Sequence, residues 1–360
     1  MGYKPLRKED VLTKIEEMLE NIKDQYSTGV ITFEKPVSRN VKTGIMENNI
    51  IKFTGKERKI NTKSQKGLTY IYRLVQVLKL SRELIKNRKS ITIRDLYYIS
   101  SNWGDDKAFA SQSSARQFLL DLEVLLGVPH EALSFYVEEQ KDQTRIMGNV
   151  IAKYRDLKGR EKVINFNEHD YGSLLPVNFL YLDEVEFKID AEFVLAIETG
   201  GIFRRLVEEE YHKKRNCILV LTSGQPSRTT RRLIKKFNEE YGLPVYVFTD
   251  GDCYGWLISM VIKHGSFTLS HISELLACPK AEFIGVSTDD IINYKLPGEK
   301  LTKHEVNKLK AMLNDPRFSS HWWQKQIKEM LKLKRSAEQQ SLVKYGLDFV
   351  VKYLDEKIGG

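Results

Sequence analysis

Residues 245–258 read VYVFTDGDCYGWLI and decide the fold of the second half of the chain. A β-branched and aromatic run closes on Asp250, Gly251 and Asp252, and apolar residues at helical spacing follow Gly255. This pattern predicts a buried strand, an acidic turn and a helix. Carboxylates two positions apart on an extended backbone point to one side, and Gly251 leaves the approach to them uncrowded. Hard oxygen ligands at this spacing suit Mg²⁺.

A second acidic residue follows a strand of the same kind. Residues 193–197 predict a buried strand that ends in Glu198, and residues 217–222 predict another. A helix expected over residues 230–241 leads into the strand before the acidic turn, so strands and helices alternate. This order predicts a parallel, right-handed α/β unit with its acidic residues at the carboxyl ends of strands. Glu198, Asp250 and Asp252 are therefore candidate ligands for one or two Mg²⁺ ions.

A purely structural interpretation competes with the metal site. An Asp-Gly-Asp sequence is often only a turn between strand and helix, in which the first aspartate caps the helix. A single glutamate at a strand end is no more specific. The two acidic positions occur in one alternating α/β block, and glycine follows each of them, so together they favour a metal site.

Composition sets broad limits on the protein class. The 360 residues, 41% of them hydrophobic, leave room for two domains and an additional arm. There is no apolar run of membrane-spanning length and no hydrophobic signal region in MGYKPLRKED, so we expect a cytoplasmic protein without membrane contact. Cys217, Cys253 and Cys278 lie far apart, which argues against a zinc site or a disulfide framework and for a reducing compartment.

Positive charge is concentrated in one stretch. Residues 51–90 contain twelve Lys or Arg and two acidic residues, a balance of +10 against +9 for the whole chain. A basic block beside a folded region predicts a polyanionic partner such as nucleic acid. Solvated lysine-rich faces without such a partner are also common.

The first part of the chain predicts a different order of elements. Residues 8–26 carry a helical apolar stripe that must pack on its own core or on another chain, and residues 29–62 alternate like strands. Three helices are then expected over residues 68–84, 94–99 and 113–126, followed by strands over 133–137 and 146–153. Three helices and a hairpin are typical of a winged-helix module, whose third helix usually enters the DNA major groove, although the same order also serves protein contacts.

We therefore predict a multidomain α/β protein. Its segments are an N-terminal arm at 1–67, a winged-helix domain at 68–155, a linker at 156–173 and an α/β domain with a mainly parallel sheet at 174–360. The last segment is expected to contain a strand at 282–286 and helices at 304–313, 321–333 and 337–354.

A tyrosine on the predicted winged helix is a candidate nucleophile. In residues 94–98, RDLYY, Arg94 and Tyr98 lie four positions apart and share a helical face. A guanidinium beside a phenol can neutralise a phosphate while the phenolate attacks it. The competing interpretation is that one of two adjacent tyrosines on a helix belongs to the core.

Four motifs occur in a characteristic order: RDLYY at 94–98, IETGG at 197–201, SGQPSRTTRRLI at 223–234 and TDGDCYGWLI at 249–258. Together they resemble the catalytic A subunit of archaeal type IIB DNA topoisomerases (topoisomerase VI), a family that includes the meiotic double-strand-break protein Spo11. The similarity runs from about residue 68 to the C-terminus, and the abundance of Lys, Ile and Glu suits an archaeal source. Cys253 departs from the proline that is more common in the family after the acidic turn, and it is no proposed ligand.

The resemblance implies a catabolite-activator-like winged helix followed by a Rossmann-like Toprim domain, in a homodimer. It implies that Tyr98 is the nucleophile and that Arg94 supports the phosphate. Glu198, Asp250 and Asp252 take the Toprim positions for Mg²⁺, and Glu198 is also a candidate general acid or base. The tyrosine of one protomer would act with the metal site of the other.

The same resemblance implies a larger machine acting on double-stranded DNA. Each tyrosine would take a 5′ phosphate, giving a double-strand break with short 5′ overhangs through which a second duplex passes. ATP would be bound by a GHKL-type B subunit in an A₂B₂ assembly, because this chain has no Walker motif. We expect the N-terminal helix to meet that B subunit.

Three other functions stay open from sequence. The first is a Spo11-like protein that forms breaks without strand passage. The second is a Toprim nuclease or primase-like enzyme that hydrolyses DNA with metal-activated water and in which Tyr98 is structural. The third is a catalytically silent DNA-binding module.

Overall fold

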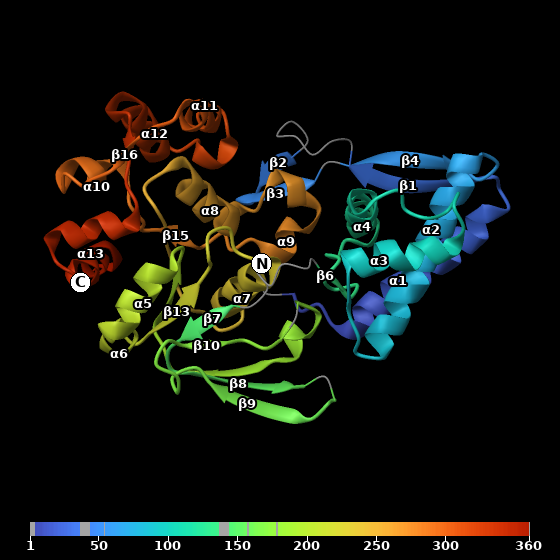
Figure 1. The fold of residues 1–360 in the computed structure, drawn as a ribbon, viewed down its shortest axis with the longest axis horizontal. Helices are drawn as coiled ribbons and strands as arrows, with labels where there is room; N and C mark the ends of the chain where they lie inside the picture. The colour runs from blue at the N-terminus through green and yellow to red at the C-terminus, as the bar shows by residue number, and fades with distance from the viewer. Residues whose placement is uncertain are drawn as a thin grey trace.

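A computed structural model describes residues 4–36, 44–53, 55–136, 144–156, 158–177 and 179–359. The chain forms an N-terminal lobe, blue to cyan in Figure 1, and an α/β lobe that continues into the C-terminal helices. Within these ranges no helix combines the length and apolarity needed to cross a bilayer. Residues 1–3, 37–43, 54, 137–143, 157, 178 and 360, which belong to predicted segments, lie outside the described residues.

The N-terminal lobe is built from four helices and short strands. Its elements are α1 (Lys8–Tyr26), β1 (Val30–Pro36), β4 (Gly55–Asn61), α2 (Gln65–Lys86), β5 (Ile91–Thr92), α3 (Ile93–Ser100), α4 (Gln112–Leu126) and β6 (Phe135–Tyr136). The intervening strands β2 (Gly44–Glu47) and β3 (Ile50–Phe53) lie on the α/β lobe instead, against α8 (Cys253–His264) and α9 (Ser273–Leu276) (Figure 1). Strand β1 pairs antiparallel with β4, and β2 pairs antiparallel with β3. The strands and the three later helices confirm the predicted elements.

The apolar stripe of α1 packs within its own chain. Val11, Ile15 and Ile22 are buried in the core shared with α2, against which α1 lies (Figure 1). Of the two options left open by the sequence, packing on the chain's own core is therefore the one found.

The predicted hairpin of the winged-helix module is wrong. Strand β6 pairs in parallel with β5, whereas β7 (Arg145–Met147) joins the sheet of the α/β lobe. Strand β8 (Val150–Arg155) pairs with β9 (Glu161–Asn165) and β11 (Glu186–Ile189). Alternating apolar residues predict that a segment is a strand, but they do not specify its partner, and here the partners lie in other parts of the chain.

The predicted linker is also partly structured. Strand β9 lies inside residues 156–173, and β10 (Ser173–Leu174) pairs with β7 at the far edge of the main sheet. The charged sequence of this segment suggested a solvated connection. Its Val163 and Ile164 instead belong to an edge strand of the three-stranded sheet.

The main sheet has the strand order β10-β7-β13-β12-β14-β15. Strands β13 (Cys217–Leu221), β12 (Phe193–Ile197), β14 (Val245–Phe248) and β15 (Glu282–Phe283) run parallel to one another. Strand β7 runs opposite to them, and β10 pairs antiparallel with β7 at the edge. The sheet is therefore mixed and mainly parallel, as predicted.

Alternation along the central strand divides the core in two. Val194 and Ala196 face the core that contains α7 (Arg228–Glu239) and continues into the N-terminal lobe. Phe193, Leu195 and Ile197 face the core that contains α5 (Gly200–Glu208). Helices cover both faces, so the carboxyl edge of the parallel strands is the edge left for chemistry.

The remaining elements surround this sheet. They are the 3-10 helices Phe179–Glu184, Phe267–Ile272, Pro316–Phe318 and Gln339–Tyr345, the strands β16 (Glu299–Lys300) and β17 (Arg335–Ser336), and the helices α6 (Tyr211–Lys214), α8 (Cys253–His264), α9 (Ser273–Leu276), α10 (Thr288–Asn293), α11 (Lys303–Met312), α12 (His321–Leu333) and α13 (Phe349–Ile358). A further 3-10 helix, Ser101–Trp103, follows α3 in the N-terminal lobe. The single helix predicted over 337–354 is wrong. Gly346, at φ 117°, separates the 3-10 helix from α13.

Candidate active site

The predicted acidic residues follow two neighbouring parallel strands and lie at the carboxyl edge of the main sheet. Strands β12 and β14 pair with Ile197 opposite Phe248, so Glu198 and the acidic turn leave the sheet side by side. The backbone N–H of Asp250 donates to Glu198 Oε2 at 2.9 Å. The structure thus places these acids at one edge of the sheet, where the sequence pattern predicts them.

The two aspartates of the turn have different structural roles. Asp252 is the N-cap of α8, and its carboxylate accepts hydrogen bonds from the N–H groups of Tyr254 and Gly255 at 2.8 and 2.7 Å. The capping interpretation thus applies to the second aspartate and not to the first. Asp250 instead accepts a hydrogen bond from the backbone N–H of Gln339 at 2.8 Å.

The three carboxyl groups carry raised pKa values. Burial raises the pKa of Glu198 to about 7, and the negative charges of Asp250, Asp252 and Glu338 contribute to this rise. Burial and the charges of Asp252 and Glu338 likewise raise the pKa of Asp250 to about 6. Burial is also the main cause of the raised pKa of Asp252. Each group is more costly to ionise than in water, and a cation at this edge would relieve that cost.

The donor set fits a hard divalent cation. All the candidate ligand atoms are carboxylate oxygens. Glu198, Asp250 and Asp252 do not form a group in which one oxygen from each lies within 4.8 Å of the other two. Mg²⁺ keeps several water ligands and is usually bound by one or two carboxylates directly. The spacing therefore suits an ion that is held partly through water.

A fourth acidic residue and a glutamine belong to this edge and were missed from sequence. Glu338 is exposed and close enough to raise the pKa values of Glu198 and Asp250. Gln339 is fully buried, 89 positions from the Asp250 carboxylate that it contacts. The polar run AEQQ at 337–340 was the available signal, but it was assigned to a helix.

Tyr98 lies in the other lobe, on α3. A capping box of Thr92 and Asp95 starts the helix, and Ile93, Leu96 and Ser100 bury one face of it. The side chain of Tyr98 is 54% exposed, which excludes the interpretation of this residue as core. Within the part of the chain that the structure describes, no hydrogen bond or ion pair joins Tyr98 to the three acids.

The neighbours of Tyr98 distinguish it from Tyr97. Tyr97 is half-buried against the core, and its ring centroid lies 5.2 Å from that of Tyr98. The guanidinium carbon of the exposed Arg94 lies 5.9 Å from the centroid of the Tyr98 ring. The predicted pair thus presents a phenol and a guanidinium together at the surface, while the first tyrosine supports them.

The three cysteines are buried and free. Cys253 is the first residue of α8, next to the acidic turn, and burial raises the pKa of its thiol to about 12. It is therefore an unreactive core residue. A proline would fit the same helical position, because the backbone N–H at the first position of a helix has no partner within the helix.

The basic stretch is only partly available to a partner. Three of its arginines are used within the chain: Arg73 donates to Lys107 O at 2.7 Å, Arg82 pairs with Glu16 at 3.2 Å and Arg88 with Glu184 at 3.5 Å. Among the residues of the stretch whose side chains are described, the exposed lysines are Lys59, Lys63, Lys66, Lys79, Lys86 and Lys89.

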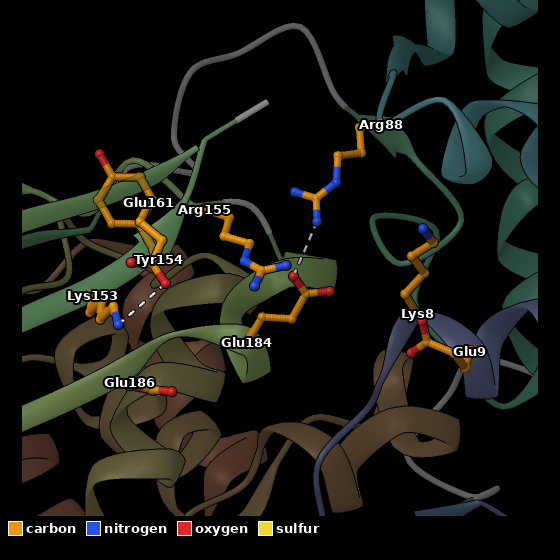
Figure 2. Close-up of a pocket in the computed structure, with 9 residues that line it drawn as sticks. All are labelled: Lys8, Glu9, Arg88, Lys153, Tyr154, Arg155, Glu161, Glu184 and Glu186. Carbon is orange, nitrogen blue, oxygen red and sulfur yellow. Dashed lines mark ion pairs between the residues drawn. The ribbon is translucent and has the colours of Figure 1, made fainter. Parts of the chain in front are cut away.

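A cavity of about 350 Å³ lies where the N-terminal lobe meets the three-stranded sheet (Figure 2). Its lining comprises Lys8, Glu9, Arg88, Lys153, Tyr154, Arg155, Glu161, Glu184 and Glu186. The four basic and four acidic side chains balance, and ion pairs join Arg88 to Glu184 and Lys153 to Glu161. The cavity contains none of the predicted site residues, and its charge does not favour a polyanion.

A buried ionic network joins the two lobes. Glu123 of α4 accepts hydrogen bonds from Arg228 of α7, from the His130 backbone N–H at 2.9 Å and from His271 at 2.9 Å. Arg228 also donates to Glu131 at 2.9 Å. Burial alone would raise the pKa of Glu123, but Arg228 and the two histidines outweigh it and hold the pKa well below its usual range.

This network also has the spacing of a metal site. Glu123, His130 and Glu131 place three ligand-type atoms within 4.8 Å of one another, the one such group among the described residues. The guanidinium of Arg228 contacts both carboxylates and already supplies the positive charge that a cation would bring. We therefore assign the network to the junction between the lobes and not to catalysis.

Sequence comparisons match both lobes. A family model for the Toprim domain shared by the topoisomerase 6 A subunit and Spo11 matches residues 193–358, and one described as type IIB DNA topoisomerase matches residues 69–135. The A subunit of type 2 DNA topoisomerase 6 from Archaeoglobus fulgidus is 37% identical over 347 residues, covering 95% of this chain and 94% of the relative. The chain belongs to the family of topoisomerase 6 A subunits and Spo11.

Two other relatives that carry the same name support this family membership. That of Methanothermobacter thermautotrophicus is 38% identical over 357 residues, covering 98% of each chain, and that of Haloarcula marismortui is 36% identical over 302 residues, covering 83% of this chain and 81% of its own length. Membership in this family makes the chain an enzyme of the type II DNA topoisomerase class. Its Toprim domain implies divalent-metal binding, in agreement with the carboxylate oxygens of Glu198, Asp250 and Asp252, which together we call the acidic edge.

Proposed function

We propose that this chain is the DNA-cleaving and religating component of a type IIB topoisomerase and that Tyr98 is its nucleophile. The observation that carries the proposal is the exposed Tyr98 ring beside Arg94, on a helix within the region that matches the type IIB family. A nucleophile that attacks duplex DNA must be presented at the surface. The exposed lysines of the basic stretch would hold the phosphate backbone.

In the proposed cleavage step the phenolic oxygen of Tyr98 bonds to a backbone phosphorus. The bond from that phosphorus to the 3′ oxygen breaks, and the 3′ oxygen leaves as a hydroxyl after taking up a proton. The proton lost by the phenol goes to a base. The DNA then carries a 5′ phosphate linked to tyrosine, and the reverse of the step reseals the strand without ATP, because the link keeps the energy of the phosphodiester.

Arg94 and the acidic residues would neutralise the phosphate, transfer protons and bind the metal. The guanidinium of Arg94 would neutralise the phosphate as the phenolate approaches. Glu198, with a pKa of about 7, suits a general acid or base at neutral pH. Glu198, Asp250 and Asp252 would hold Mg²⁺, which when bound would stabilise the charge on the phosphate oxygens.

Tyr98 lies on α3 of the N-terminal lobe and the acids lie at the ends of β12 and β14 in the α/β lobe, which supports an assembly in which two copies act together. The tyrosine of one protomer would work with the acidic edge of the other, so a homodimer would cut both strands. Strand passage requires ATP, and we propose that a GHKL-type B subunit binds it in an A₂B₂ complex. The archaeal relatives are each named as the A subunit of a topoisomerase, which supports this arrangement.

Trapping the covalent intermediate tests the proposal. The chain, assembled with its ATPase partner, is incubated with duplex DNA, Mg²⁺ and ATP, and the DNA is analysed under denaturing conditions. We expect a protein–5′-DNA adduct that is absent in Tyr98→Phe. Tyr97→Phe is the matched control, because it removes the adjacent hydroxyl and should leave the adduct in place.

The same experiment separates the alternatives. DNA ends free of protein in both wild type and Tyr98→Phe would establish hydrolysis and overturn the nucleophile. The Spo11 part of the family description favours a second candidate, a break-forming protein without strand passage. That candidate predicts an adduct but no ATP-dependent relaxation of supercoiled plasmid.

A further inference from the structure

Residues 337–339 reach the acidic turn from a distant part of the chain. The N–H of Gly251 donates to Ala337 O at 2.8 Å, and the N–H of Ala337 donates to Gly251 O at 3.1 Å. The N–H of Gln339 donates to Asp250 Oδ1 at 2.8 Å. This segment therefore fixes both the backbone of the turn and the direction of its first carboxylate.

The side chain of Gln339 connects the same segment to the other strand end. The hydroxyl of Thr199, the residue after Glu198, donates to Gln339 Oε1 at 3.0 Å. The Gln339 side chain is fully buried, and its Nε2 has no hydrogen-bond partner among the described residues. An amide buried in this way costs free energy, so apolar packing alone does not account for a glutamine here.

We infer that Gln339 is a positioning residue of the acidic edge, holding Asp250 and the Glu198–Thr199 strand end at a fixed separation for a divalent cation. The inference rests on the proposed metal-binding role of the acids. Groups that hydrogen-bond to metal-binding carboxylates from the outside typically contribute roughly 10- to 100-fold to metal affinity. Gln339 contacts one such carboxylate through its backbone and the neighbour of another through its side chain.

Mn²⁺ binding to the full-length chain, without DNA or ATP, tests the side-chain contact. Gln339→Met keeps the length of the side chain and removes the acceptor, and Thr199→Val removes the donor. Each change should weaken Mn²⁺ binding about 10-fold in calorimetric and electron paramagnetic resonance titrations. The double variant should also lose about 10-fold, and not about 100-fold, because both changes remove the same bond. Thr199→Ser, which keeps the hydroxyl, should bind as wild type.

Gln326→Met is the matched control. Gln326 is equally buried, but its side chain contacts Asp289, accepting from the backbone N–H at 3.1 Å and donating to the carboxylate at 2.7 Å. This variant should melt at a lower temperature and bind Mn²⁺ as wild type. Equal weakening of binding by Gln326→Met and Gln339→Met would show general destabilisation and overturn the inference.

Asp250→Ala separates failure of the inference from failure of the proposed function. Loss of Mn²⁺ binding in Asp250→Ala together with wild-type affinity in Gln339→Met and Thr199→Val overturns the positioning role alone. Wild-type affinity in Asp250→Ala overturns the proposed metal site itself. If Gln339→Met does not fold, Thr199→Val and Thr199→Ser examine the same bond from its other end.

Discussion

At the scale of single residues, Gly251 shows how closely the acidic turn is packed. A Cβ at this position would lie 2.7 Å from Val286 Cγ1, 2.9 Å from Val286 O and 3.0 Å from Ala337 O. Two of these three atoms belong to the backbone and have little freedom to move. The glycine between the aspartates is therefore required by the close approach of residues 286 and 337, which the sequence pattern could not reveal.

Gly251→Ala should both destabilise the protein and disturb the acidic edge. Overpacking of this kind costs about 1–3 kcal/mol, and the turn can accommodate the methyl group only by moving Asp250 and Asp252. We expect a lower melting temperature and Mn²⁺ binding weakened roughly 10-fold or more by calorimetry, the loss typical when metal-binding carboxylates are no longer held in place. Gly200→Ala is the control, because at this position, at the start of α5, a Cβ would meet no described atom within 4 Å apart from its chain neighbours and the adjacent helix backbone. Wild-type Mn²⁺ affinity in Gly251→Ala would contradict the packing argument.

At the scale of elements, α8 depends on the same residue that is proposed to bind metal. The Asp252 carboxylate caps the first turn of the helix through two backbone N–H groups. A capping role and a ligand role are compatible, because a carboxylate has two oxygens and both hydrogen bonds go to Oδ1. The two roles can be separated by choosing the replacement.

Asp252→Asn should keep α8 and lose metal-dependent cleavage. Asparagine is as good an N-cap as aspartate, whereas alanine at an N-cap costs about 0.5–2 kcal/mol. We therefore expect near-wild-type thermal stability in Asp252→Asn and a lower melting temperature in Asp252→Ala. Neither variant should form the covalent DNA adduct, while both should retain salt-sensitive DNA binding. Adduct formation by Asp252→Asn at the wild-type rate would show that the residue is only a cap.

At the scale of the whole molecule, the network around Glu123 holds the lobe with the tyrosine against the lobe with the acids. Glu123 comes from α4, whereas Arg228 begins α7 and His271 lies in the following 3-10 helix. All three side chains are buried or nearly so. Removing one partner of a buried pair leaves the other charge uncompensated.

Glu123→Gln should lower the free energy of unfolding by about 3–5 kcal/mol at pH 7, measured by urea denaturation. The folded pKa of Glu123 lies well below its ordinary value, so its contribution is fully present above the unfolded pKa and is lost as the pH falls through the folded pKa. The difference between wild type and variant should be constant across neutral pH and shrink in strong acid.

Glu20→Gln is the control for this prediction. Glu20 pairs with Lys23 at 3.2 Å, and both side chains are mostly exposed. Exposed pairs of this kind contribute about 0–1 kcal/mol, so the change should be small at every pH. A Glu123→Gln difference that grows as the pH falls would contradict the assigned direction of the pKa shift.

Local sequence patterns account for most of the helices and strands and for the placement of the acidic residues at one sheet edge. The β-branched runs before Glu198 and Asp250 predicted parallel strands, and the alternation with helices placed both acids at one edge. Helical spacing placed Arg94 and Tyr98 on one face, since residues four apart share a face, whereas their proposed roles came from the family resemblance. The helix over 321–333 and the N-terminal helix over 8–26 were predicted at their observed bounds. Each of these features depends on residues that are near neighbours in the chain.

Only the tertiary structure decided which distant segments meet. In the folded chain β7 and β8 pair in sheets outside the predicted winged helix, and residues 337–339 contact the acidic turn. The side chains that hydrogen-bond to Glu123 also come from distant segments. Short strands such as β7 carry too few residues to specify a partner by pattern, and a hydrogen bond between Gln339 and Asp250 leaves no local periodicity in either segment. The spacing of apolar residues determines whether a segment forms a helix or a strand. Which distant segments pair depends on how all the helices and strands pack together in the folded chain.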